Sequence, residues 1–176
     1  MTRVLGWTLA VVALVASGAW AEDQACPMPM AKPSAALETM QSLAGTWTGT
    51  AKHADGTEEP ATVEYRVTSG GSAVAETLSP GTPHEMISMY HDQGGKLAMT
   101  HYCMLGNQPE LVLHDAAPGR LNLEASAQTR AALGGQLYMS SLVLEQPAAG
   151  ELVQTWTAVD AQGQPTDATI LVLKKQ

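Results

Sequence analysis

The chain of 176 residues contains no phenylalanine, and aromatic residues of all kinds make up only 5% of it. Basic residues are also few: 9 Lys and Arg stand against 17 Asp and Glu, which gives a formal net charge of −8 at pH 7. This charge makes nucleic acid and anionic membrane surfaces poor partners. Because Phe is missing, we expect the 9 methionines to share with leucine the filling of the core.

Motifs that mark nucleotide-binding and catalytic proteins are missing as well. No Gly-rich phosphate loop precedes a helix, which argues against nucleotide cofactors. The sequence contains no nucleophile elbow, no Ser-x-x-Lys motif and no pair of carboxylates at a catalytic spacing, so no motif defines an active site. The ingredients of nucleophilic catalysis are nonetheless present in Ser88, Cys103, His84, His101 and Glu76. A barrel enzyme of isomerase or hydrolase type is therefore kept as an alternative, and we favour a role that is not enzymatic.

The one long apolar run of the chain lies at its N-terminus. Arg3 precedes this run, which extends from Val4 to Ala16 and is shorter than the ~20 residues that a helix needs to cross a bilayer. Small residues follow at the first and third positions of 19–21, as signal peptidase requires. We predict a signal peptide over 1–21, a periplasmic or secreted location, and no membrane span after cleavage.

Cleavage after Ala21 would leave 155 of the 176 residues, the size of one ordinary domain, and the loss of Arg3 would change the net charge from −8 to −9. We assign 22–33 to a flexible lead-in and 34–176 to a single domain. In an oxidising compartment, a disulfide between Cys26 and Cys103 is the default expectation. The alternative is that Cys26 does not pair, because a mobile lead-in docks poorly.

Two patterns follow each other in the proposed domain. Ser34 to Leu43 has apolar residues three apart, at Leu37, Met40 and Leu43, which predicts one short helix that Gly45 ends. Ten short runs rich in Val, Thr, Leu and Tyr come after it, each ended by Gly, Pro, Asn or Asp. We place these strands near 46–53, 61–69, 72–79, 84–91, 96–105, 110–115, 120–127, 136–146, 151–160 and 167–175.

The connections between these runs are short turns, such as 69–71 and 92–95. Connections of this length join only antiparallel neighbours. Ten strands in an open meander would leave exposed edges, and closing the sheet removes them. The sequence therefore predicts an all-β fold, a closed antiparallel up-and-down barrel of about ten strands, with one short N-terminal helix at one end.

Gly45-Thr46-Trp47 stands at the start of the first strand, directly after the helix. This placement resembles the Gly-x-Trp signature of the calycins, which include lipocalins, fatty-acid-binding proteins and the ten-stranded nitrobindins. The resemblance implies that the Trp closes the base of the barrel and that the interior binds a small apolar ligand. In lipocalins a basic side chain of the last strand lies across the Trp, a place that Lys174 or Lys175 would take. Nitrobindins hold haem through a histidine near the C-terminus, whereas no histidine follows His114 here, so haem is not expected.

The hairpin from His84 to Met104 has the greatest density of chemically active side chains, and this segment is similar to one in uncharacterised bacterial secreted proteins. Alternation along the strands, with a turn centred on 93–95, pairs even positions of the first strand with odd positions of the second. We predict that one resulting face lines the interior: His84, Met86, Ser88, Tyr90, Leu97, Met99, His101 and Cys103.

The same reasoning applies to the neighbouring hairpin, which turns at 70–71. It sets Val63 opposite Leu78 and Tyr65 opposite Glu76, so that Glu76 becomes an acid on an otherwise apolar face. If this carboxylate is buried, it needs a partner such as a tyrosine, a basic side chain or a ligand. If the face lies near the mouth of the barrel, water solvates Glu76 instead.

These expectations combine into an exported, monomeric, calycin-like barrel without a cofactor, which binds a small apolar or amphipathic molecule. The predicted ligand contacts are Trp47, Val63, Tyr65, Glu76, His84, Met86, Ser88, Tyr90, Leu97, Met99 and His101. The alternative is a metal-binding protein that uses His84, His101 and Cys103, since imidazole and thiolate bind zinc and copper. Against it, positions 101 and 103 of one strand are ~6.5 Å apart, which is wide for joint coordination.

Overall fold

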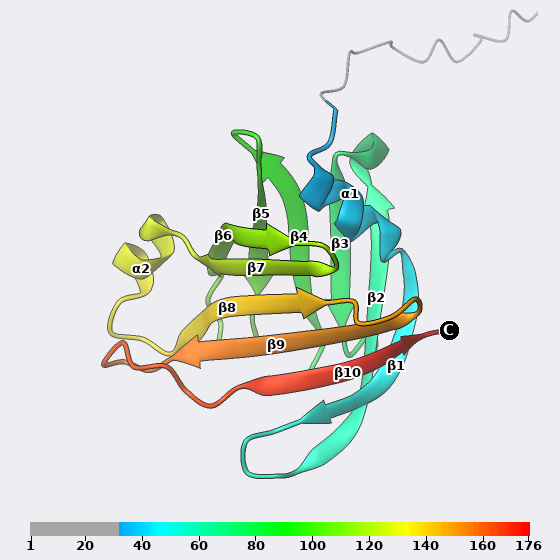
Figure 1. Cartoon of the computed structure of the whole chain (residues 1–176). Helices are drawn as coiled ribbons and strands as arrows, with labels where there is room; N and C mark the ends of the chain where they lie inside the picture. The colour runs from blue at the N-terminus through cyan, green and yellow to red at the C-terminus, as the bar shows by residue number, and fades with distance from the viewer. Residues whose placement is uncertain (1–31) are drawn as a thin grey trace, which may run out of the picture. The chain divides into compact units, whose positions relative to one another are not determined.

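The computed structural model describes residues 32–176, which form ten strands and two α-helices (Figure 1). The predicted signal peptide and Cys26 lie outside the described residues. The helices are α1 (Ala35–Ser42) and α2 (Ala127–Leu133), and a short 3-10 turn covers Ser69–Gly71. The strands are β1 (Gly45–Lys52), β2 (Glu58–Thr68), β3 (Ala73–Leu78), β4 (Met86–Gln93), β5 (Lys96–Tyr102), β6 (Glu110–Ala117), β7 (Arg120–Ala125), β8 (Tyr138–Glu145), β9 (Glu151–Val159) and β10 (Thr169–Lys175).

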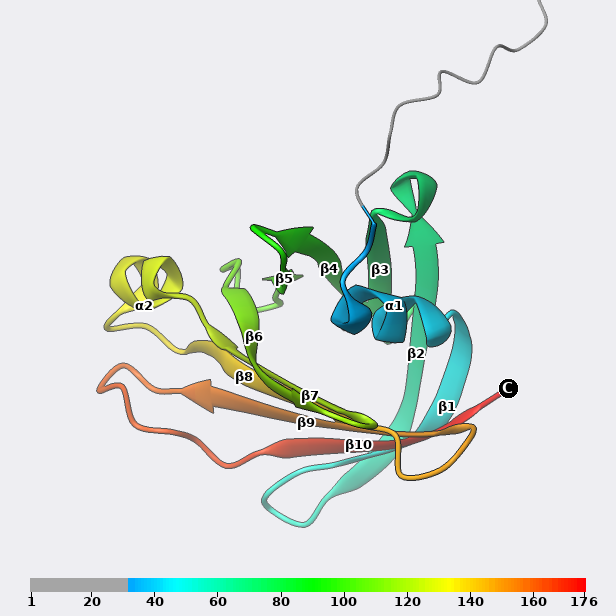
Figure 2. The same cartoon turned by 45° about the horizontal axis from the view of Figure 1, so that its top comes forward.

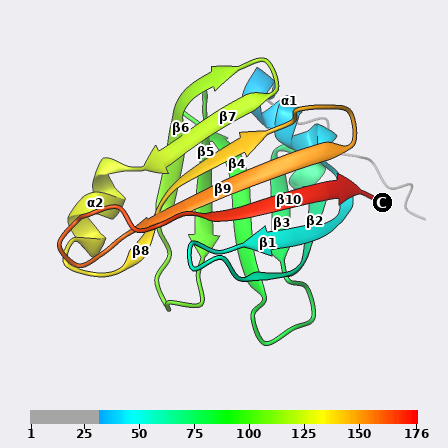
Figure 3. The same ribbon diagram turned by 60° about the horizontal axis from the view of Figure 1, so that its bottom comes forward.

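All ten strands pair antiparallel with their neighbours in sequence, and β1 also pairs with β10, so the sheet closes into a barrel. Figure 3 shows β10 lying between β9 and β1 at this closure. The closed up-and-down barrel predicted from the sequence is thus confirmed. Its predicted register is confirmed too, since Tyr65 lies opposite Glu76, and even positions of β4 pair with odd positions of β5, as Ser88 does with His101.

Helix α1 closes one end of the barrel. The Ser34 hydroxyl caps the helix by accepting a hydrogen bond from the Leu37 amide at 3.2 Å. Ser34 is fixed in turn by Asp92 of β4, whose carboxylate accepts from its amide and its hydroxyl, both at 2.7 Å. Leu37, Met40 and the following Leu43 are buried, and the helix contacts β2, β3, β4 and β5. Figure 2 shows α1 lying across this end, as the apolar spacing predicts.

Trp47 of β1 lies beneath this helix, at the closed end of the barrel. Its indole N–H donates a hydrogen bond to the Leu43 carbonyl at 2.7 Å. Lys175, its partner across the β1–β10 ladder, places Nζ 5.4 Å from the centroid of the Trp47 ring, within the range of a cation–π contact. A basic side chain of the last strand therefore lies across the tryptophan, as expected, and it is Lys175 rather than Lys174.

The structure corrects the sequence prediction in two places. A second helix, α2, follows the N-cap Ser126, whose hydroxyl accepts from the Thr129 amide at 3.1 Å. Thr129 is the one buried residue of α2, so the segment has no apolar stripe that would have indicated a helix. The hairpin strands are also shorter than predicted, because a turn that bonds the Glu85 amide to the Thr82 carbonyl precedes β4, and Cys103 starts a turn after β5.

The barrel closes tightly where β1 meets β10. Gly49 of β1 pairs with Leu173, and a Cβ atom added at Gly49 would lie 1.9 Å from the carbonyl oxygen of Val172. Only glycine therefore permits this approach of the first and last strands. Within residues 32–176, neither helix is long and apolar enough to span a membrane.

Candidate functional site

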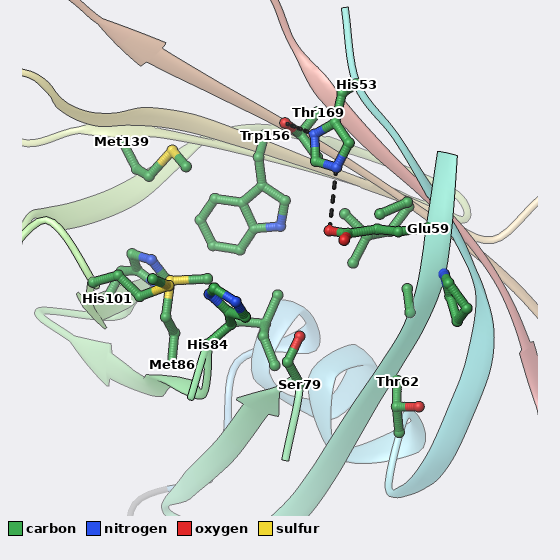
Figure 4. Close-up of a pocket in the computed structure, with 16 residues that line it drawn as sticks. His53, Glu59, Thr62, Ser79, His84, Met86, His101, Met139, Trp156 and Thr169 are labelled. Atoms are coloured by element: carbon green, nitrogen blue, oxygen red, sulfur yellow. Dashed lines mark hydrogen bonds and ion pairs between the residues drawn. The ribbon is translucent and has the colours of Figure 1, made fainter. Parts of the chain in front are cut away.

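A cavity of about 270 Å³ lies at the end of the barrel opposite α1 (Figure 4). The end of β1 and the start of β2 line this cavity, together with residues of β3, β4, β5, β8, β9 and β10. Apolar side chains make up most of its wall, and three of them are methionines. The lining residues are Ala51, His53, Glu59, Pro60, Ala61, Thr62, Leu78, Ser79, His84, Met86, His101, Met104, Met139, Trp156, Thr169 and Leu171.

His101 and Trp156 contribute two contacting rings to this wall. The ring centroids are 4.9 Å apart, and the ring planes are tilted by 41°. His101 is buried, and its Nδ1 lies 3.0 Å from Oγ of Ser88, while Nε2 has no hydrogen-bond partner among the described residues. Burial lowers the pKa of His101 to about 4, so its imidazole is neutral at pH 7. Nε2 is therefore an unused polar atom of a side chain that lines the cavity.

A buried carboxylate, Glu76, stands at the centre of a hydrogen-bond network inside the barrel. It accepts from the Tyr65 hydroxyl at 2.7 Å, from the Tyr90 hydroxyl at 2.9 Å and from the Gln154 side-chain amide at 2.6 Å. Burial raises the pKa of Glu76, and these hydrogen bonds act in the opposite direction by stabilising the charged form. Among the ion pairs of residues 32–176, none involves Glu76. Neutral donors from three side chains therefore surround this carboxyl group.

The network connects Glu76 to both rings of the cavity. Gln154 accepts a hydrogen bond from the Trp156 indole N–H at 2.8 Å and donates to Glu76. Ser88, which lies opposite Glu76 across the β3–β4 ladder, contacts His101. One buried side chain thus stands between Glu76 and each of the two rings that line the cavity.

Glu76, Ser88 and His101 do not form a nucleophilic triad. In such a triad the histidine stands between the acid and the serine, and the serine hydroxyl reaches the substrate. Here Ser88 stands between Glu76 and His101 and is fully buried. It cannot attack a molecule in the cavity, so the arrangement argues against the hydrolase alternative.

The structure distributes the predicted ligand contacts over several places. His84, Met86 and His101 line the cavity, with His84 in the exposed loop before β4. Four others form the polar network: Tyr65, Glu76, Ser88 and Tyr90. Val63, Leu97 and Met99 belong to the buried core, and Trp47 lies at the closed end.

Sequence reasoning missed Trp156, Gln154 and Met139. The first two lie on the buried face of β9, where buried and partly buried residues alternate along the whole strand. The period-two rule, applied to this strand, would have found a polar Gln on an apolar face. Figure 4 also shows His53 at the cavity, 3.2 Å from Glu59 and 3.5 Å from Thr169.

The metal alternative concerned His84, His101 and Cys103. Over 32–176, no group of three or more His, Cys, Asp and Glu side chains is arranged to hold a metal ion. Cys103 is partly buried in the turn after β5 and is not among the residues that line the cavity. Its pairing with Cys26 stays a prediction, because Cys26 lies outside the described residues.

The fold and cavity define a closed ten-stranded antiparallel β-barrel with a helix over one end and a cavity at the other. No protein-family model and no curated protein sequence matches the chain. In structure it is similar to a protein of unknown function from the DUF3598 family of Nostoc punctiforme PCC 73102, with a TM-score of 0.53 and 12% identity. This similarity covers 78% of the chain and 49% of that protein, so the chain spans about half the length of this relative. A redesigned β-barrel matches with a TM-score of 0.38 and 12% identity, over 78% of this chain and 94% of that one.

Proposed function

We propose that this protein is an exported, calycin-like carrier, which binds a small apolar or amphipathic molecule in the cavity opposite α1. The observation that carries the proposal is Nε2 of His101, a buried polar atom that has no partner among residues 32–176 and belongs to a side chain lining a mostly apolar cavity. Small-molecule sites are commonly of this kind, with apolar walls and a few polar groups that orient the ligand. The volume of about 270 Å³ equals that of about nine water molecules in the liquid, which suits a ligand of one or two rings.

Energetics favour this function over a purely structural barrel. A buried polar atom without a hydrogen bond destabilises a fold by about 1–3 kcal/mol. An apolar side chain in place of His101 would avoid that loss and would fill the same space. A ligand that hydrogen-bonds to Nε2 compensates for the loss whenever it is bound, which gives a reason for the histidine.

The calycin resemblance and the predicted export complete the proposal. The contact of Lys175 with Trp47, beneath α1, supports the resemblance, and the closed barrel is the architecture that calycins use. The predicted signal peptide supports action in the periplasm or outside the cell, where the negative net charge keeps a monomeric carrier soluble.

Native mass spectrometry tests the proposal on protein produced from the whole chain and purified from the periplasm without denaturation. We expect an additional mass that is released when the protein unfolds. Ala61→Phe places a ring in the cavity and should abolish this mass, whereas Val172→Phe adds the same ring at an exposed position of β10 and should preserve it. The carrier function would be contradicted if the wild-type protein released no additional mass, or if Ala61→Phe and Val172→Phe released the same additional mass.

A further inference from the structure

The tautomer of His101 decides which kind of group its Nε2 can bind. A neutral imidazole has one N–H donor and one acceptor nitrogen. If Nδ1 bears the proton, Nε2 accepts a hydrogen bond from a ligand. If Nε2 bears the proton, the ligand must be an acceptor instead. The partner of Nδ1, Ser88, therefore determines the chemistry offered to the cavity.

The hydrogen bonds around Glu76 fix the direction of this contact. Tyr65, Tyr90 and Gln154 direct donors at the carboxyl group, and Ser88 lies opposite Glu76 across the β3–β4 ladder, on the same buried face. Three donors around one carboxyl group fit an ionised carboxylate, which only accepts. The buried Ser88 hydroxyl beside it then directs its single proton to Glu76, so its Oγ accepts from Nδ1–H of His101. Nε2 is left as an acceptor.

The charges near the cavity favour an uncharged ligand. Among the described residues that line it, none is a Lys or an Arg, and Glu59 lies at its margin next to His53. A negatively charged ligand in the cavity would be repelled by the Glu76 carboxylate, which lies in the barrel interior beyond His101. The described residues that line the cavity supply no Lys or Arg to compensate this charge. The imidazole is neutral and therefore attracts no carboxylate.

The apolar part of the wall favours an aromatic ligand over an alkyl chain. Trp156 offers its ring, since its N–H is already used by Gln154. Met86, Met104 and Met139 line the same cavity, and thioether sulfur contacts aromatic rings favourably, often at the ring edge. Met86 lies two positions from Ser88 on the same face of β4, diagonal to His101. Nε2 is buried, so these flexible side chains must move to admit a ligand to it.

We infer that the cavity binds an uncharged aromatic molecule with a hydroxyl or N–H group, which donates a hydrogen bond to Nε2 of His101 and packs its ring against Trp156. This inference rests on the proposed carrier function and names the ligand class of the same cavity. Phenols, naphthols and indoles belong to this class, whereas aromatic carboxylates and long acyl chains do not.

Three probes of the same ring system test the inference: 2-naphthol, naphthalene and 2-naphthoate, titrated into the purified protein while Trp fluorescence is followed. We expect 2-naphthol to bind about tenfold more tightly than naphthalene, the difference that one hydrogen bond makes. No binding of 2-naphthoate is expected. In His101→Phe, 2-naphthol should bind no better than naphthalene. His114→Phe changes an exposed histidine of β6, which does not line the cavity, and should leave the preference intact.

The protonation of His101 is measured separately, by long-range ¹H–¹⁵N NMR on the free protein. We expect Nδ1 to be protonated and Nε2 to be unprotonated, with Ser88→Ala abolishing this distinction. A protonated Nε2 in the wild-type protein would overturn the inference without any reference to ligand binding.

The outcomes separate this inference from the carrier function. Equal affinities for 2-naphthol and naphthalene would leave a carrier of apolar molecules and would overturn the role of the hydrogen bond. A released mass that proves to be an acyl chain or a carboxylate would do the same. Failure of all probes, together with the absence of any released mass, would overturn both proposals.

Discussion

Ser88 and His101 face each other across the β4–β5 hairpin, with Oγ 3.0 Å from Nδ1 inside the barrel. This contact occupies one nitrogen of the imidazole, and Nε2 has no partner among residues 32–176. Because Ser88 also lies opposite Glu76 across the β3–β4 ladder, one buried hydroxyl group stands between this carboxyl group and the histidine of the cavity.

Removal of the Ser88 hydroxyl should destabilise the fold. In Ser88→Ala, Nδ1 of His101 loses its buried partner, so we expect a loss of about 1–3 kcal/mol in the free energy of unfolding. Urea denaturation measures this loss. Ser72→Ala removes an exposed hydroxyl that bonds only to the Ser69 carbonyl and should change stability by less than about 0.5 kcal/mol. Equal effects of the two changes would contradict the role of Ser88.

The stability of the protein should depend on pH through His101. Its pKa is lowered from 6.5 to about 4 in the folded state, so between these values the unfolded chain binds more protons. Stability should therefore fall as the pH decreases from 6.5 towards 4, by up to about 3 kcal/mol. Burial raises the pKa of Glu76, and its protonation in the folded state acts in the opposite direction.

The contribution of His101 is isolated by comparing wild-type protein with His101→Phe. Thermal unfolding at a series of pH values should show a steeper loss of stability towards acid in the wild type, because only this protein has the buried imidazole. Parallel curves for the two proteins would show that His101 does not titrate as its environment requires.

Barrel closure should fail when Gly49 acquires a side chain. The Cβ of Gly49→Ala would lie 1.9 Å from the Val172 carbonyl oxygen, which forces β1 and β10 apart. Crowding of this kind typically destabilises a protein by about 1–3 kcal/mol. Thr50→Ala, at the next residue, leaves the same methyl side chain at a position where β1 already accommodates a Cβ, and serves as the control. Chemical denaturation compares the two, and equal stabilities would argue against close approach at this seam.

Lys175 should contribute more to stability than its neighbour Lys174. The contact of Lys175 with the Trp47 ring is worth about 0.5–1 kcal/mol, whereas Lys174 is largely exposed and lies 3.9 Å from Glu151. We therefore expect Lys175→Met to lower the melting temperature and Lys174→Met to leave it nearly unchanged. The reverse order would contradict the cation–π contact.

Much of the fold could be predicted from local pattern. Turns of two to four residues allow only antiparallel neighbours, and the period of two fixes which side chains share a face. For this reason the position of Tyr65 opposite Glu76, and the common face of Ser88 and His101, followed from two turn positions. Glu76 was recognised as an acid on an apolar face, which is where the structure places it.

The rest of the site depends on contacts across the barrel, which local pattern does not contain. Gln154 binds Glu76 from 78 positions away along the chain, and periodicity shows a face of β9 without showing what lies opposite it. Trp156 was missed for the same reason. Helix α2 was missed because its residues lack an apolar stripe. His84 was placed on a strand, although it lies in the turn before β4, which begins at Met86.

The most direct measurement is the ¹⁵N NMR spectrum of His101 in protein as isolated, compared with the same protein after its bound molecule has been extracted. If a ligand occupies the cavity, Nε2 of His101 should shift on extraction, while the exposed His114 on β6 should not. Identical His101 resonances before and after extraction, with no mass released, would contradict the binding of a small molecule at this site.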